Sequence, residues 1–136
     1  MRVTALSLLL VTSGVAFADT HADVVDLFAS MTAALSEENP AGFLKAFDRG
    51  AASLDALKRD VQGLVLTYEV GSSVEVLKDE GDGQKRTVEL DWFLELRSRQ
   101  AGGPTVRRRE VIQCELALRD KRWRIVSMTP LTLFRP

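Results

Sequence analysis

The spacing of apolar residues changes once along this chain, and that change constrains the fold more than any other feature. Between His21 and Gly63 apolar residues recur every three or four positions, as on one face of an α-helix. From Leu64 onward they alternate with polar residues, as in half-buried β-strands. A run of helices followed by a run of strands is typical of the α+β class.

Three helices are predicted in the first half. A capping box at Thr20–Asp23 would start the first helix, Asn39-Pro40 would start the second, and Ser53 would cap a third that ends near Gly63. The first helix carries its apolar stripe at Val24, Leu27, Phe28, Met31 and Leu35.

Four strands are predicted in the second half, beginning at Leu64. Residues that lie opposite each other in an antiparallel pair share a face of the sheet. One continuous apolar face results when Val76 pairs with Val88, Trp92 with Ile112, and Leu118 with Trp123. We therefore expect a four-stranded antiparallel meander with the helices on one side.

The first 18 residues have the order of a secretory signal peptide. Arg2 gives a positive start, Leu6–Phe17 is mostly apolar, and Ala16-Phe17-Ala18 is a small-x-small cleavage pattern. The apolar stretch is shorter than the roughly 20 residues that a membrane span needs. We predict cleavage near Ala18, a single mature domain over residues 19–136, export to the periplasm or beyond the cell, and no membrane span.

The composition excludes several classes of function. Lys and Arg number 18 against 19 Asp and Glu, and a net charge of -1 lacks the basic footprint of a nucleic-acid-binding protein. A single Cys and a single His form neither an intrachain disulfide nor a tetrahedral zinc site. We expect no nucleic-acid partner, no metal site and no cofactor, and we expect Cys114 to be a buried, inert thiol.

Four segments carry a resemblance to a known family: Asp23–Phe28, Asn39–Phe47, Glu89–Trp92 and Lys121–Val126. Their order resembles the nuclear transport factor 2-like superfamily, although a cystatin-like arrangement of the same parts is equally compatible. The resemblance implies three N-terminal helices packed on a curved four-stranded antiparallel meander sheet that encloses an apolar pocket. It also implies that an enzyme of this family would place an Asp or His in the pocket as general base, but no such residue has a matching position here. A third helix stands where family members often have a short hairpin.

The inward face of the predicted sheet supplies a candidate ligand pocket. His21 is expected to be an exposed cap residue and Asp91 an outward surface charge, so no catalytic residue is assigned. An apolar cavity with a few polar groups is typical of small-ligand sites. The candidate pocket residues are Phe28, Tyr68, Trp92, Leu94, Arg108, Glu110 and Ile112. The alternatives are plain core packing for the apolar members and a solvated ion pair for Arg108 and Glu110.

The outward face is less polar than a solvated sheet requires. Phe93, Val111, Val126 and Met128 are predicted there, which indicates an interface and favours a homodimer. The leading hypothesis is an exported, non-catalytic domain that binds a small apolar ligand or a protein partner. The alternatives are an isomerase-, dehydratase- or cyclase-type enzyme, with Glu110 or Asp91 as base and Tyr68 assisting, and a structural dimeric envelope module.

Overall fold

The computed structural model describes residues 13–136, with side chains from residue 19 onward. Three helices come first: α1 (Ser13–Ser36), α2 (Pro40–Leu44) and α3 (Leu54–Thr67). Of the predicted signal segment, residues 1–12 lie outside the described part and residues 13–18 form the first turns of α1.

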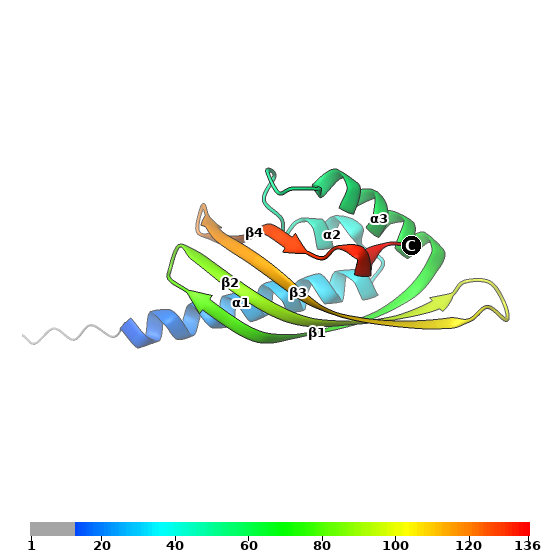
Figure 1. Ribbon diagram of the computed structural model, residues 1–136, viewed down its shortest axis with the longest axis horizontal. Helices are drawn as coiled ribbons and strands as arrows, with labels where there is room; N and C mark the ends of the chain where they lie inside the picture. Colours follow the sequence, from blue (N-terminus) through cyan, green and yellow to red (C-terminus); the bar gives the residue numbers. More distant parts are fainter. Residues whose placement is uncertain (1–12) are drawn as a thin grey trace, which may run out of the picture.

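The second half forms one antiparallel sheet in the order β1-β2-β3-β4, which confirms the α+β meander. The strands are β1 (Tyr68–Gly81), β2 (Lys85–Ser98), β3 (Thr105–Arg119) and β4 (Arg122–Thr129), and a 3₁₀ turn follows at Thr132–Phe134. The helices lie on one side of the sheet, and the hairpin between β2 and β3 extends beyond them (Figure 1).

The free edge of β4 is covered by the chain that follows α2. The Asp48 N–H donates to the Ile125 carbonyl at 2.8 Å, and the Ile125 N–H donates to the Ala46 carbonyl at 2.9 Å. Phe47 thereby forms a parallel bridge with Ile125. This short segment covers the middle of the β4 edge and joins the helical layer to the sheet.

Two helix boundaries differ from the prediction. Helix α1 begins at Ser13 and not at Thr20, because the residues just upstream include two alanines and no proline and so continue the helix. Helix α3 continues to Thr67, and its buried residues at Leu57, Val61, Leu64 and Val65 keep helical spacing. Leu66, predicted in a strand, is 77% exposed on α3, so the first strand starts at Tyr68.

The predicted register is right for one hairpin and shifted in the other two. Leu118 faces Trp123 as predicted. Val76, however, faces Leu90 and not Val88, and Ile112 also faces Leu90 on the other side and not Trp92. Both shifts are two residues, so the paired residues named here keep their predicted face. Turn geometry and a bulge between Val76 and Lys78 set these registers, and neither is visible in the apolar pattern.

A second bulge overturns the placement of Met128 on the outer face. The register of β3 and β4 shifts between Glu115 and Leu116, so that Met128 lies opposite the inward-facing Cys114. Met128 is buried in the core and is no part of an outer surface.

Candidate functional site

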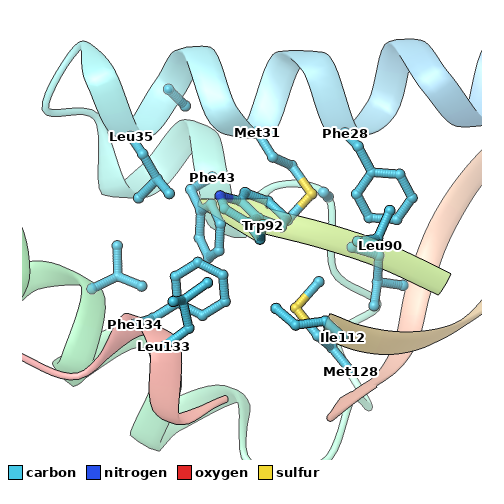
Figure 2. Packing of buried hydrophobic residues seen from close by; sticks show 14 of the residues in the cluster. Phe28, Met31, Leu35, Phe43, Leu90, Trp92, Ile112, Met128, Leu133 and Phe134 are labelled. Carbon is cyan, nitrogen blue, oxygen red and sulfur yellow. The ribbon is translucent and has the colours of Figure 1, made fainter. Parts of the chain in front are cut away.

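The inner face of the sheet is filled by aromatic side chains. Trp92 of β2 has its ring centroid 6.5 Å from Phe28 of α1, 6.1 Å from Phe43 of α2 and 5.2 Å from Phe134 of the 3₁₀ turn. Figure 2 shows these rings and Met31 pointing toward one another from three sides of the core. Phe43 and Phe134 are themselves 5.1 Å apart. The space next to Trp92 is therefore occupied by the protein's own side chains.

The one polar atom of this cluster is satisfied internally. The Trp92 Nε1–H donates to the Ser72 hydroxyl at 2.9 Å, and the Ser72 and Thr32 hydroxyls share a hydrogen bond. Within residues 19–136, every buried side-chain nitrogen or oxygen has a hydrogen-bond partner. The fully buried polar atoms of the described inner face are therefore already paired within the protein.

The structure places the seven predicted pocket residues in or beside one core. Phe28, Trp92, Leu94 and Ile112 are all fully buried in the core. Arg108 and Glu110 lie half-buried on β3, opposite Leu94 and Trp92. Tyr68 lies opposite Ser98 near one end of β2 and packs, half-buried, against the edge of this core.

Arg108 holds the C-terminal segment in place. Its Nη1 donates to the Leu133 carbonyl at 3.1 Å and also to the Arg135 carbonyl. Among the described residues no ion pair joins Arg108 to Glu110, so the rim pair considered from the sequence is not formed. The guanidinium instead fixes the turn that carries Leu133 and Phe134 into the core.

The outer face carries a ladder of paired charges. Arg109 Nε donates to Asp91 Oδ1 at 2.9 Å, and this hydrogen bond holds the pKa of the Asp91 carboxyl below its usual range. Arg107 contacts Glu95 at 3.3 Å. Because these arginines are paired with carboxylates on the neighbouring strand, their positive charge is locally compensated.

A groove with walls of opposite charge lies between α1, α2 and the turn that joins β3 to β4. Its volume is about 580 Å³, and Leu27 and the nearly buried Trp123 form part of its lining. The acidic wall consists of Asp23 and Asp26 of α1 and of Glu37, which directly follows the helix. The basic wall consists of Lys45, Lys121, Arg122 and Arg124. Sequence analysis missed this groove, although the basic run from Lys121 to Arg124 was a signal for it.

The rim of the groove contains an unfavourable backbone conformation. Asp120 and Lys121 form the tight turn between β3 and β4, with φ of 50° and 67°. Such a turn favours glycine or asparagine, because a β-carbon is strained at positive φ. Lys121 in this conformation therefore lowers the stability of the fold locally. Strained backbone conformations of this kind concentrate at functional sites.

A buried carboxylate links the first half of α1 to the sheet. Asp79 has a side chain that is 2% exposed, and its two oxygens contact Arg86 Nε at 2.5 Å and His21 Nδ1 at 2.6 Å. His21 is exposed, as predicted, with 55% of its side chain accessible. The two partners are 58 positions apart, so no local sequence pattern could have paired them.

Residues 13–136 contain no cluster of three or more His, Cys, Asp or Glu side chains that could hold a metal ion. None of their helices is long and apolar enough to cross a bilayer.

Comparison with solved structures identifies the fold. A candidate scytalone dehydratase from Novosphingobium aromaticivorans superposes with a TM-score of 0.73 at 11% identity, covering 86% of this chain and 85% of its own. A type 2 hexachlorocyclohexane dehydrochlorinase (LinA) gives 0.66 at 14% identity, with 81% and 82% covered. An NTF-2 like protein of unknown function from Shewanella oneidensis gives 0.59 at 12% identity, with 80% and 96% covered.

The chain therefore has the nuclear transport factor 2-like, cystatin-like fold that its sequence resembles. No family model matches it, and neither does any curated protein. At these identities the likeness extends to the fold alone, and proteins with this fold include both enzymes and binders.

Proposed function

We propose that this chain is an exported, non-catalytic binding domain that recognises a protein partner at its surface. The observation that carries the proposal is the aromatic packing around Trp92. A small apolar ligand and a pocket base both need an enclosed space beside the inner face, and Phe28, Phe43 and Phe134 fill that space. We therefore do not propose for this chain the dehydratase or dehydrochlorinase activity named for two of its structural neighbours.

The charged groove is the surface that best fits a partner. It offers acidic groups from α1 on one side and basic groups such as Lys121 and Arg122 on the other. A polypeptide segment carries both signs of charge along one extended chain and can match two such walls, whereas an apolar small molecule would desolvate them without compensation. The strained Lys121 at the rim supports the same assignment.

The proposal that the protein is exported rests on its sequence. The leader pattern that ends at Ala18 supports delivery of residues 19–136 to the periplasm or beyond the cell. The partner would then be another exported or envelope protein.

A photo-crosslinking experiment in cells of the source organism tests the groove. We expect p-benzoylphenylalanine in place of Ser30, which lines the groove, to give a discrete crosslinked product. The same residue in place of Lys58, exposed on α3 and outside the groove, should give none. The double variant Lys121→Glu and Arg122→Glu should abolish the product. Equal crosslinking from both positions, or a product that survives charge reversal, would contradict a groove-bound partner.

A homodimer through the outer sheet face is a second candidate. Val111 is 49% exposed there, with Phe93 and Val126 half-buried on the same face. Burying this apolar surface against a second copy would remove it from water. We expect sedimentation equilibrium at about tens of micromolar to give a dimer, and Val111→Glu to give a monomer. Leu66→Glu, on the exposed side of α3, is the control that should leave the dimer intact. A monomer for the unsubstituted protein would exclude this candidate.

A further inference from the structure

The chain's single histidine occupies a special position if the signal segment ends at Ala18. The exported protein would then begin Asp19-Thr20-His21, with the imidazole on the third residue from a free α-amine. We propose that this N-terminus is a binding site for Cu²⁺ or Ni²⁺. The ligands are the Asp19 α-amine, the backbone nitrogens of Thr20 and His21, and Nδ1 of His21. This inference rests on the export step of the proposed function and on no other part of it.

The ligand set follows from the covalent structure of the chain. Each adjacent pair of backbone nitrogens closes a five-membered ring with the metal, and the His21 amide nitrogen and Nδ1 close a six-membered ring. Four nitrogens held in this way lie in one plane, the geometry that Cu²⁺ and Ni²⁺ favour and that Zn²⁺ does not. Each bound ion displaces one proton from the α-ammonium and one from each of the two amides, and no electron is transferred. The expectation of no metal site was based on side-chain ligands alone, whereas three of the four ligands proposed here are main-chain nitrogens.

The surroundings of His21 allow its imidazole to leave its present contact. Nδ1 faces Asp79 at 2.6 Å, and the other oxygen of the same carboxylate contacts Arg86 at 2.5 Å. Because Arg86 keeps Asp79 paired, moving His21 to a metal would not strand a buried charge, which is the costly outcome.

Access to the site is also favourable. The His21 side chain is 55% exposed, and its neighbours Asp19, Ala22 and Asp23 are exposed as well. In the exported protein these residues would form the first turn of α1. The first turn of a helix makes the fewest backbone hydrogen bonds, so it can wrap around an ion with little loss of helix.

The test uses the full chain, produced with its own leader and purified from the exported fraction. Intact mass first establishes the N-terminal residue, which we expect to be Asp19. Titration with CuCl₂ should then give the visible absorption and electron paramagnetic resonance spectra of a planar four-nitrogen Cu²⁺ site, complete at one equivalent. ZnCl₂ should not compete.

Three variants separate this site from adventitious binding. His21→Ala should lose the four-nitrogen spectrum. A glycine inserted between Ala18 and Asp19 moves the imidazole to the fourth position and should also abolish the spectrum, with His21 still present. Asp55→Asn, which changes an exposed carboxylate on α3 that is no ligand, should leave the spectrum unchanged.

The outcomes distinguish this inference from the function on which it rests. A mass that does not begin at Asp19 would overturn the predicted cleavage and this site with it. A chain that begins at Asp19 but shows no four-nitrogen spectrum, or keeps it after the glycine insertion, would overturn the site alone. Neither result bears on the groove, which is tested by crosslinking.

Discussion

At the scale of single residues, the Ser72 hydroxyl organises the centre of the core. It accepts the Trp92 indole N–H at 2.9 Å and shares a hydrogen bond with Thr32. Ser72→Ala would leave the buried N–H without an acceptor, so we expect it to lower the free energy of unfolding by about 1–3 kcal/mol in urea titrations. Ser73→Ala, on the exposed face of the same strand, should change it by less than about 0.5 kcal/mol. Equal effects of the two variants would contradict the assigned hydrogen bond.

Cys114 is the residue whose titration is most altered by folding. Burial raises the pKa of its thiol from 9.0 to about 12. Since the pKa is raised in the folded state, its contribution to stability is complete below pH 9 and is lost progressively as the pH rises toward 12, at up to about 1.4 kcal/mol per pH unit. We expect urea titrations at pH 8, 9.5 and 10.5 to show a steeper alkaline loss for the unsubstituted protein than for Cys114→Ala. Parallel pH profiles would show that the thiol ionises equally in both states.

At the scale of elements, the C-terminal 3₁₀ turn closes the core. Phe134 is fully buried against Phe43 and Trp92, and Arg108 anchors the turn through backbone carbonyls. Removing the ring leaves a cavity, so we expect Phe134→Ala to lower the free energy of unfolding by about 3–5 kcal/mol. Leu66→Ala, on the exposed side of α3, is the control and should cost less than about 0.5 kcal/mol. A small loss for Phe134→Ala would mean that the turn does not seal the core.

In the turn between β3 and β4, a substitution that relieves the backbone strain should stabilise the fold and weaken binding at the groove. Lys121 has a φ of 67°, so we expect Lys121→Gly to raise the free energy of unfolding by about 0.5–1 kcal/mol while it weakens the groove crosslink from position 30. Arg122→Gly, in the extended strand that follows, should lower stability instead. If Lys121→Gly destabilised the protein, the backbone strain assigned to the turn would be absent.

At the scale of the whole molecule, the sequence was sufficient for the fold and for the face on which most strand residues lie. The change from helical to alternating spacing predicted three helices and four strands, because burial of one face imposes those periods. Bulges escaped prediction, since one extra residue such as that near Glu115 turns Met128 inward without changing the local composition.

The candidate site was also predictable only in part, because the residues that decide its shape are far apart in the sequence. Trp92, Leu94 and Ile112 were placed on the inner face, but a sequence pattern does not show whether inward side chains leave a space between them. Phe43 and Phe134 decide that question from distant parts of the chain. The groove and the Asp79–His21 contact also join segments far apart in sequence, beyond the reach of any local signal.

The central claim is that the protein's own rings fill the inner face, and nuclear magnetic resonance with benzene as probe tests it most directly. We predict that the Trp92 indole N–H signal of the unsubstituted protein does not shift as benzene is added, because no space beside the ring admits it. The same signal in Phe134→Ala should shift and saturate, since apolar cavities of this kind bind benzene. A saturable shift in the unsubstituted protein would reveal an open pocket beside Trp92 and contradict the claim.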